Sequence, residues 1–466
     1  MDSRLLAEAL DFLGAHRDDY RVHRMVVLRH GYLVLDASFY PFVHGQRHDL
    51  ASVTKSFTST LVGIALDSGF IASVDQPVVS FFPEREIANL DDRKRAMTVE
   101  HLLTMRSGLA CDPGSSEQTL REMFQSPDWV QFVLDLPMAD EPGERWVYCS
   151  PAVHLLSAIL EQATGLPTVD FARSDLFRPL GITDSLWLVD PAGTARGWGD
   201  LHLDTLDMAK LGQLFLNRGR WPGRRVVSSA WVERATTDDQ GYGYLWFTSP
   251  ELFSAQGRAG QLVFVLPGQD LVLALNAGGS LTGQDSAVVS ELLNTHVLGA
   301  VRSDAPLLPD PAGVAMLEQR VSEAATSNEG PPQPVPTLPG TAWAISGRAY
   351  LFEPNPFGFS RMRLTFVPES DQALLEAWIP PVLDDDQLTV AIGLDGVSRL
   401  SPGLYGGTLA ASGSWETDTL FAARVDALGL ISLWRYAFAF DGDAVTVAIE
   451  CLAGEEPSGT IVGTAE

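Results

Sequence analysis

Cysteine and histidine are scarce in this chain of 466 residues. Its three cysteines, Cys111, Cys149 and Cys451, are too few and too scattered for a disulfide framework or a zinc site, so we expect reduced thiols. Its nine histidines show no His-Glu-x-x-His or comparable metal-ligand spacing. The sequence therefore predicts no metal site.

Positive charge is also scarce, because 32 lysines and arginines face 59 aspartates and glutamates and leave a net charge of -27. This balance argues against nucleic acid and anionic membranes as partners, and it disfavours strongly anionic substrates. The chain also lacks a membrane-length apolar run, and its first residues lack the apolar core and cleavage site of a secretory signal. We expect a soluble cytoplasmic protein, whose association into a homo-oligomer is left open.

Hydrophobic residues make up 45% of the chain, which is enough for a large core. Its length favours two domains. Residues 303–340 hold eight prolines and one plausible helix, which is typical of a linker. Residues 341–466 show short alternating runs separated by turn signals such as Asp395-Gly396. We expect seven or eight antiparallel strands there, forming a small barrel or sandwich.

Residues 1–302 read as a mixed domain. Residues 24–39 predict a β-hairpin, and two further strands are expected within residues 261–277. Amphipathic helices lie between these ends, and the strongest is expected from Ser150 as N-cap to the stop at Gly165. This order predicts an α+β fold in which one sheet, built from distant segments, is flanked by helices.

The stretch "DLASVTKSFTSTLVGIALDSG" predicts a helix that begins with Ser52 and Lys55 on one face. A serine becomes a nucleophile only when an adjacent base accepts its proton, and the helix N-terminus and burial both disfavour a charged ammonium. The plain alternative is a capping serine and a solvated lysine. Against it, the chain has only three lysines, and arginine cannot act as a base.

Four ordered stretches together resemble the serine beta-lactamase-like hydrolases: "LASVTKSFTSTLVGIALDSGFI", "TVEHLLTMRSGL", "YCSPAVHLLSAILEQATG" and "GQLVFVLPGQDLVLAL". That superfamily includes class C beta-lactamases, penicillin-binding proteins, family VIII carboxylesterases, D-aminopeptidases and 6-aminohexanoate-dimer hydrolases. The resemblance covers residues 20–300 and implies a beta-lactamase/transpeptidase-like antiparallel sheet flanked by helices, with an all-helical subdomain. Less specifically, the C-terminal strands resemble the lipocalin-like barrel that some members carry.

The resemblance implies that Ser52 is acylated, that Lys55 is its base and that Tyr148 moves protons to the leaving group and then activates water. It also implies that the backbone N–H groups of Ser52 and Arg258 form the oxyanion hole. Ser150 stands where the family often has asparagine, with contact to substrate left open beside a role as helix cap.

The third motif departs from the family pattern. Ala255-Gln256-Gly257 replaces Lys-Thr-Gly or His-x-Gly, so the usual cation is missing, although Gly257 still permits close approach of the backbone to substrate. Arg258 either supplies a substitute charge or is solvated, and Gln261 either lines the pocket edge or faces water. Trp198 is a candidate pocket wall, with ordinary packing as the alternative.

No Gly-x-Ser-x-Gly elbow occurs, and His154, on the helix after Tyr148, is more simply a satisfied helix histidine than a site residue. The sequence thus predicts a cofactor-free serine hydrolase of esters or small amides. The alternatives are a linear-amide hydrolase of the 6-aminohexanoate-dimer or D-aminopeptidase type, a beta-lactamase, and a catalytically silent binding or scaffold protein. The barrel either covers the cleft, contributes a loop, mediates association or is purely structural.

Overall fold

The computed structural model describes residues 1–112, 117–237, 240–279, 286–326, 330–379, 387–453 and 458–466. The chain divides into two compact units. The first comprises Met1–Arg24, Ala37–His48 and Ala277–Glu466, and the second comprises Met25–Asp36 and Asp49–Asn276. Since each unit combines separate stretches of chain, this division differs from the sequential boundaries at 302 and 340, which stay a prediction.

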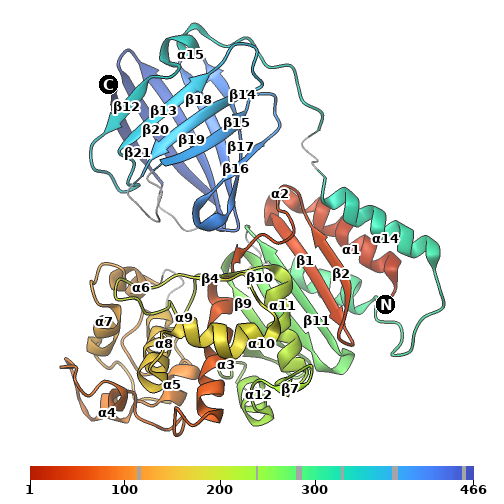
Figure 1. Cartoon of the computed structure of the whole chain (residues 1–466), viewed down its shortest axis with the longest axis vertical. Coiled ribbons are helices and arrows are strands. Elements are labelled where there is room, and N and C mark those ends of the chain that lie inside the picture. Colours follow the sequence, from red (N-terminus) through yellow and green to blue (C-terminus); the bar gives the residue numbers. More distant parts are fainter. Residues whose placement is uncertain (113–116, 238–239, 280–285, 327–329, 380–386, 454–457) are drawn as a thin grey trace. The chain divides into compact units, whose positions relative to one another are not determined.

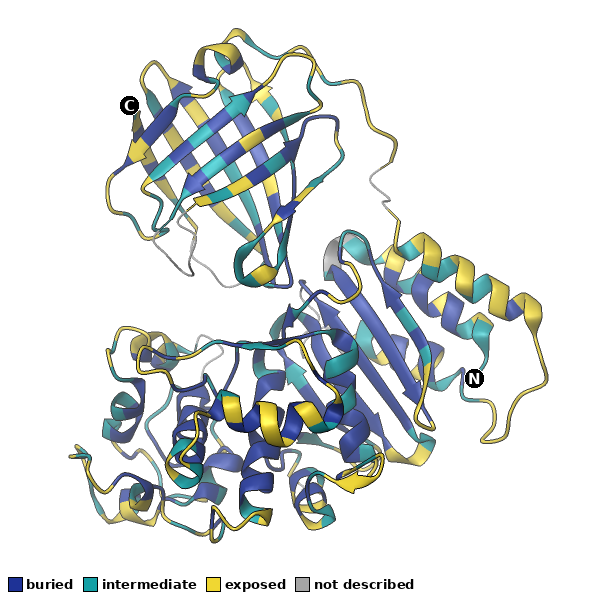
Figure 2. Ribbon diagram, in the orientation of Figure 1, coloured by how far each residue is buried: buried dark blue, intermediate teal, exposed yellow. Residues whose placement is uncertain are grey.

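The second unit is built around a six-stranded sheet with the order β2-β1-β11-β10-β9-β8. Strands from both ends of residues 1–302 meet in it, as predicted, and β8 to β11 pair in succession as antiparallel neighbours. Figure 2 shows its central strands buried along almost their whole length. The strands are β1 (Val22–Arg29), β2 (Tyr32–Ser38), β8 (Phe247–Thr248), β9 (Phe253–Gly257), β10 (Gln261–Leu266) and β11 (Leu271–Ala277), with only the ends of β1, β2 and β11 assigned to the first unit.

Helices flank this sheet, and the central one is α3 (Thr54–Asp67), which packs against α8 (Ser150–Thr164) (Figure 1). All residues of α3 from Thr54 to Ala65 are buried, as expected for a helix enclosed on all sides. On the sheet, α11 (Thr205–Leu216) packs against β10. The remaining helical elements of this unit are η1 (Ala51–Val53), η2 (Val78–Phe81), α4 (Asp92–Ala96), α5 (Val99–Leu103), α6 (Gln118–Met123), α7 (Trp129–Asp135), α9 (Thr168–Ala172), η3 (Arg173–Phe177), α10 (Arg178–Leu180), α12 (Ser229–Thr236), η4 (Arg258–Gly260) and η5 (Pro267–Gln269).

Small sheets complete the second unit. β5 (Leu201–Leu203) pairs with β4 (Leu186–Trp187), and β3 (His48–Asp49) lies on its other side in the three-stranded order β3-β5-β4. A two-stranded ribbon joins β6 (Arg220–Trp221) and β7 (Arg224–Arg225). The β3-β5 pairing matters for the site, because it brings the chain just before Ser52 next to the segment that follows Trp198.

The first unit contains the C-terminal barrel, a ten-stranded sheet within the described residues, in the order β15-β14-β13-β12-β21-β20-β19-β18-β17-β16. A further pairing of β15 with β17 closes it. Its inward aromatic and aliphatic side chains form a core of their own. The strands are β12 (Ala349–Phe352), β13 (Arg361–Phe366), β14 (Gln372–Trp378), β15 (Gln387–Gly393), β16 (Arg399–Pro402), β17 (Thr408–Thr417), β18 (Leu420–Leu428), β19 (Ser432–Asp441), β20 (Ala444–Ala453) and β21 (Gly459–Ala465).

The barrel therefore has more strands than the seven or eight that the sequence predicts. The strands that sequence reasoning missed are β16, β17 and β21. β16 and β17 contain few β-branched or large apolar side chains, so their intrinsic strand preference is weak, and they become strands because neighbouring strands supply hydrogen-bond partners. β21 was overlooked although four of its seven residues are β-branched. Closed pairing also removes the exposed edges that an open sheet would leave.

The N-terminal helix α1 (Ser3–Ala15) packs alongside α14 (Pro311–Ala324), which is the helix predicted within the proline-rich segment (Figure 1). Ion pairs from Arg4 to Asp310 at 2.9 Å and from Arg320 to Asp11 at 2.7 Å join the two helices. Part of the predicted linker is thus a packed helix. The other helical elements of this unit are α2 (Arg17–Tyr20), α13 (Ser286–Glu291), the π-helical η6 (Leu292–Leu298), α15 (Gly340–Ile345) and η7 (Leu404–Gly406).

Candidate active site

Ser52 and Lys55 lie together at the start of α3, as their spacing predicts. Ser52 occupies the short 3-10 turn η1 directly before the α-helix, so the helix begins two residues later than the serine. The turn is set by Ala51, which adopts a left-handed φ of 46° and donates its N–H to the Asp49 carboxylate at 2.8 Å. Ser52 is thereby held half-buried at the N-terminal end of a buried helix.

Lys55 is buried, with 1% of its surface exposed, and its amine is surrounded by three groups. Nζ lies 2.8 Å from Ser52 Oγ and donates to the Trp198 carbonyl at 2.9 Å. The Tyr148 ring lies below it, with its centre 4.8 Å from Nζ. The solvated lysine of the plain alternative is therefore wrong: the amine is enclosed and in contact with the serine hydroxyl.

Tyr148 reaches this position from the extended segment that precedes α8. The N–H of Val147 donates to the Met105 carbonyl at 2.9 Å, and the N–H of Cys149 contacts Met105 Sδ at 3.4 Å. These two bonds fix the backbone on both sides of the tyrosine. The structure thus brings Ser52, Lys55 and Tyr148 together from two distant stretches of sequence.

Gly257, at the end of β9, lies against the backbone of the serine turn. A Cβ placed on Gly257 would lie 2.7 Å from the Leu50 carbonyl oxygen and 3.0 Å from the backbone nitrogen of Ser52. Contacts this short leave no room for a side chain, so only glycine lets the strand approach the serine this closely. The N–H groups of Ser52 and Arg258 accordingly come from adjoining backbone segments, as an oxyanion hole requires.

The other side chains of the third motif hold the β9-β10 turn. Gln256 is half-buried and donates to Ser254 Oγ at 2.9 Å. Gln261 is fully buried, so the prediction that it lines the pocket edge or faces water is wrong. Its Nε2 donates to the Arg258 carbonyl at 3.2 Å, while its Oε1 accepts from Asn276 at 2.7 Å. Gln261 therefore supports the turn from inside the sheet.

Arg258 is half-buried, and its charge acts on the nearby carboxyl of Asp49. Burial raises the pKa of the Asp49 carboxyl, and the charges of His202 and Arg258 act in the opposite direction. The role of Arg258 as a substitute for the missing cation of the third motif stays a prediction.

Ser150 is the first residue of α8, and the residue that caps the helix is Cys149, whose Sγ accepts from the N–H of Ala152 at 3.4 Å. The prediction that Ser150 is the cap is thus wrong by one residue. Its hydroxyl bonds elsewhere and donates to Glu117 Oε1 at 2.9 Å, with Ser150 itself 1% exposed. Glu117, which sequence reasoning missed, therefore lies beside the second motif.

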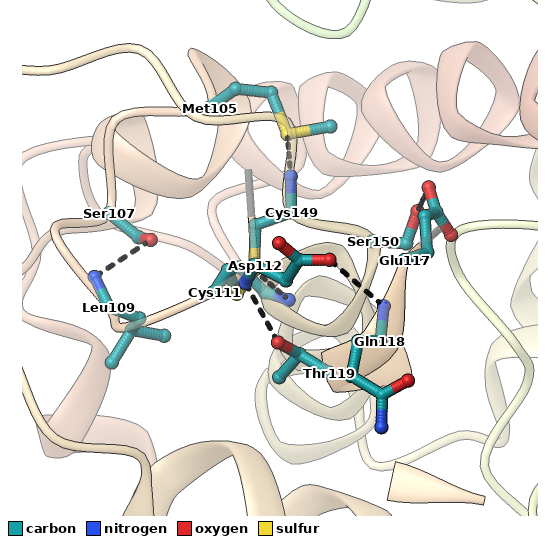
Figure 3. The surroundings of a disulfide bond; sticks show 11 residues. Met105, Ser107, Leu109, Cys111, Asp112, Glu117, Gln118, Thr119, Cys149 and Ser150 are labelled. Carbon is teal, nitrogen blue, oxygen red and sulfur yellow. Dashed lines mark hydrogen bonds between the residues drawn. A yellow bond between two sulfur atoms is a disulfide. The ribbon is translucent and has the colours of Figure 1, made fainter. Parts of the chain in front are cut away.

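A disulfide joins Cys111 to Cys149, so the expectation of reduced thiols is wrong for this pair, whereas Cys451 keeps its thiol. The bond closes a span of 38 residues and attaches the Cys111 loop to the residue that follows Tyr148. Figure 3 shows it with Met105 on one side and Thr119 on the other. Disulfides are uncommon in reducing compartments, and the cytoplasmic location accordingly stays a prediction.

Trp198 was predicted as a candidate wall of the pocket, but its side chain is only 5% exposed. Its contact with Lys55 is made by the backbone carbonyl. The indole packs against Trp129, with ring centres 5.6 Å apart, and against His154 at 5.1 Å. His154 is satisfied at one ring nitrogen only, because Nε2 lies 3.1 Å from Asp190 Oδ2 whereas Nδ1 has no partner among the described residues. Asp190 was not foreseen, because nothing in its local sequence marks it.

Groups of three or more metal-ligating side chains with suitable placement are absent from the described residues. Within the same residues, no helix is both long and apolar enough to cross a membrane.

Two curated proteins show what the sequence of this chain is similar to. A 6-aminohexanoate-dimer hydrolase of Paenarthrobacter ureafaciens is 30% identical over 242 residues, 49% of this chain and 60% of that enzyme. Esterase EstB of Burkholderia gladioli is 32% identical over 146 residues, 29% of this chain and 37% of the esterase. The matches thus span less than two thirds of either relative. The relatives are hydrolases.

In three dimensions, the octameric penicillin-binding protein homologue from Pyrococcus abyssi superposes with a TM-score of 0.51, covering 99% of this chain and all of that one. At 17% identity this likeness shows the fold alone. The family model described as Beta-lactamase matches residues 8–293, well over half of the 466 residues. The protein therefore belongs to the beta-lactamase family.

Proposed function

We propose that this protein is a serine hydrolase that cleaves neutral carboxylic esters through an acyl-enzyme on Ser52. The observation that carries the proposal is the buried Lys55 amine, 2.8 Å from Ser52 Oγ and beside the Tyr148 ring. A buried amine next to a serine hydroxyl is the arrangement that makes this weak nucleophile reactive. A solvated surface pair would have no such effect.

In the first step the neutral Lys55 amine takes the proton of Ser52 Oγ as the oxygen attacks the ester carbonyl. The carbonyl oxygen becomes an oxyanion, which the N–H groups of Ser52 and Arg258 stabilise; one such donor contributes about 2.7–4 kcal/mol. The Lys55 amine donates a hydrogen bond to the Trp198 carbonyl at 2.9 Å. This bond orients the amine so that the nitrogen lone pair points at Ser52.

The tetrahedral intermediate then collapses, and the bond from carbon to the leaving-group oxygen breaks. Tyr148 donates the proton that this oxygen needs, and Lys55 re-protonates the tyrosine. In deacylation the same groups remove a proton from water, and the water oxygen attacks the acyl carbonyl. The bond from the carbonyl carbon to Ser52 Oγ then breaks, and the proton passes to Oγ, which releases the carboxylic acid and free Ser52. The products are one alcohol and one acid, and the protein returns to its starting state.

The departures from the family pattern support an ester over a beta-lactam. A penicillin or cephalosporin carries a carboxylate, and a charge-assisted hydrogen bond to it would contribute about 1.5–3 kcal/mol. Gln256 offers no charge, and Ser150 is bonded to Glu117. The net charge of -27 also disfavours an anionic substrate.

A linear amide with a free ammonium end is the second candidate. Its support is the 30% identity to a 6-aminohexanoate-dimer hydrolase together with the Glu117 carboxylate beside the second motif. A carboxylate near the cleft would attract a cationic substrate end. Amides are harder to cleave than esters because an amine leaves less readily than an alcohol.

Parallel kcat/KM measurements on p-nitrophenyl butyrate, nitrocefin and the 6-aminohexanoate linear dimer test the proposal. We expect the ester value to be highest and the nitrocefin value lowest. A nitrocefin value equal to or above the ester value would overturn the esterase assignment, and a dominant dimer value would favour the second candidate. Failure of all three, with no labelling of Ser52 by a fluorophosphonate, would favour a catalytically silent protein.

Self-association is a further part of the proposal. One structural neighbour, which covers 99% of this chain, is described as octameric, and this supports a homo-oligomer here. Size-exclusion chromatography with light scattering measures the mass directly against the 50.5 kDa of one chain. A single species at that mass at micromolar concentration would contradict it.

A further inference from the structure

The proposed mechanism gives the Trp198 carbonyl a definite task, because it is one of two hydrogen-bond partners of the Lys55 amine. This carbonyl lies in the segment 187–201, between β4 and β5. A carbonyl in a loop keeps a fixed position only if neighbouring elements hold the loop. The hydrogen bonds and packing contacts of residues 187–201 show which side chains hold this loop.

Two threonines of α3 fix the end of the segment that lies against the helix. Thr58, one turn after Lys55, donates to the Gly197 carbonyl at 2.7 Å, and Thr54 accepts from the N–H of Leu201 at 3.3 Å. On the other side, a Cβ on Gly197 would lie 2.5 Å from Ser157 Oγ of α8. Residues 197–201 are therefore pressed between α3 and α8.

The far end of the segment is fixed by a buried pair, His154 of α8 and Asp190. Both side chains are fully buried, and His154 Nε2 lies 3.1 Å from Asp190 Oδ2. The other carboxylate oxygen accepts the N–H groups of Ala192 and Thr194 at 2.9 and 2.8 Å, which shapes the turn 190–194. His154 thus ties this turn to the same helix that begins beside Tyr148.

The histidine ring also touches the residue that bonds to Lys55. It meets the Trp198 indole edge-on, with ring centres 5.1 Å apart, and the Trp129 indole at 5.9 Å. Its Nδ1 has no hydrogen-bond partner in the described part of the chain.

We propose that His154 and Asp190 are positioning residues, which hold the Trp198 carbonyl against the Lys55 amine and so orient the base toward Ser52. This inference rests on the proposed serine hydrolase function. Neither side chain touches the reacting atoms. Displacement of a catalytic group by about 1 Å can lower a rate by 10²-fold, so a positioning contact of this kind is measurable.

Other charged groups around the pair are few and have partners of their own. Glu161 accepts from Thr194 Oγ1 at 2.8 Å and from the N–H of Thr168 at 3.1 Å, and burial raises its pKa. Arg196 pairs with Asp200 at 2.9 Å and lies over the Trp129 ring. For Asp190, burial raises the pKa, but the hydrogen bonds from His154 and Thr194 outweigh it and leave a net lowering.

The test compares His154→Leu, His154→Gln and Asp190→Asn with the unmodified protein on p-nitrophenyl butyrate. We expect His154→Leu to lower kcat by about 10- to 100-fold with KM nearly unchanged and to displace the acid limb of the pH–rate profile. His154→Gln keeps a donor near the Nε2 position and should restore most of kcat. Asp190→Asn keeps the oxygen that shapes the turn, so it reports on the pair if His154→Leu fails to fold.

His296→Leu is the matched control, because His296 is another buried histidine, in η6 and in the other unit. We expect it to lower thermal stability and to leave kcat and the pH profile unchanged. An effect of His154→Leu on stability alone, with kcat and the profile like those of the control, would overturn the inference. Equal impairment of the leucine and glutamine variants would overturn the role of the hydrogen bond.

A second readout does not depend on turnover. The chain has three lysines, so [ε-13C]lysine labelling gives three NMR signals, and that of Lys55 is assigned by its loss in Lys55→Arg. We expect the Lys55 signal to be displaced or broadened in His154→Leu and unchanged in the control; an unchanged signal in both would contradict the inference. If the unmodified protein neither turns over esters nor labels at Ser52, the proposed function fails, whereas this signal still tests the contact itself.

Discussion

Substitution of Gly257 by alanine adds one methyl group at the contact between β9 and the serine turn. The backbone of Gly257 has φ −134° and ψ 157°, which any residue adopts, so alanine brings no backbone strain. The methyl group would lie 2.7 Å from the Leu50 oxygen and 3.0 Å from both the Ala51 Cβ and the Ser52 nitrogen. Two of these neighbours are backbone atoms, and β9 or the serine turn has to shift.

Two magnitudes follow from this displacement. Overpacking of this kind costs about 1–3 kcal/mol of stability. The larger effect falls on the reaction, since the two proposed oxyanion donors, the N–H groups of Ser52 and Arg258, belong to the segments in contact here, and loss of one such donor lowers kcat by about 10²–10³-fold. We expect Gly257→Ala to lower kcat on p-nitrophenyl butyrate by at least about 10²-fold, with a folded protein and a modest decrease in Tm.

Gly268→Ala is the matched control, because a methyl group added at Gly268 would meet no atom of the described residues within 4 Å, and the φ of Gly268 is not left-handed. We expect its kcat and Tm to equal those of the unmodified protein. Circular dichroism confirms folding, and fluorophosphonate labelling reports on Ser52 in the same samples. If Gly257→Ala retained more than about a third of kcat, the N–H of Ser52 would not be an oxyanion donor in the geometry described here.

Three further predictions concern the remaining parts of the site. Lys55→Arg should be nearly as damaging to kcat as Lys55→Ala, because arginine keeps the charge but cannot act as a base; a largely active arginine variant would reduce Lys55 to an electrostatic role. Tyr148→Phe should lower kcat by about 10²–10⁴-fold while KM changes little, as measured by steady-state kinetics, and unchanged kcat would remove Tyr148 from proton transfer. Replacement of Cys111 and Cys149 by serine should destabilise the unit that contains the site by up to about 3–4 kcal/mol, given the 38-residue span, in denaturant unfolding; equal stability would show that the pair is not bonded in solution.

Local patterns in the sequence account for the parts of the site that were predicted. Ser52 and Lys55 are three residues apart, a spacing that places side chains on one helix face whatever the tertiary structure. The hairpin around His30-Gly31 and the helices α8 and α14 likewise follow from turn residues, caps and apolar periodicity. The position of Gly257 followed from the order of the family-like motifs. Because glycine has no side chain, this position predicted a close approach of the backbone to its neighbours.

Pairings between distant residues were not predictable in the same way. Cys111 and Cys149, or His154 and Asp190, lie 38 and 36 residues apart, and only the folded chain brings them together. Gln261 was misjudged because its polarity suggests the surface, whereas Asn276 and the Arg258 carbonyl satisfy it in the interior. β16 and β17 have weak strand preference and depend on their neighbours in the barrel.

The measurement that tests the central claim most directly is the site of covalent labelling. The protein and its Ser52→Ala variant are each incubated with a fluorophosphonate, and the adduct is measured first by intact-mass spectrometry and then located by peptide mapping. Turnover of p-nitrophenyl butyrate is measured on the same two proteins. The account predicts one adduct per chain, on the peptide that contains Ser52, and no adduct and no turnover in a folded Ser52→Ala variant. An adduct on another residue, or labelling and turnover that persist in Ser52→Ala, would contradict the assignment of Ser52 as the nucleophile.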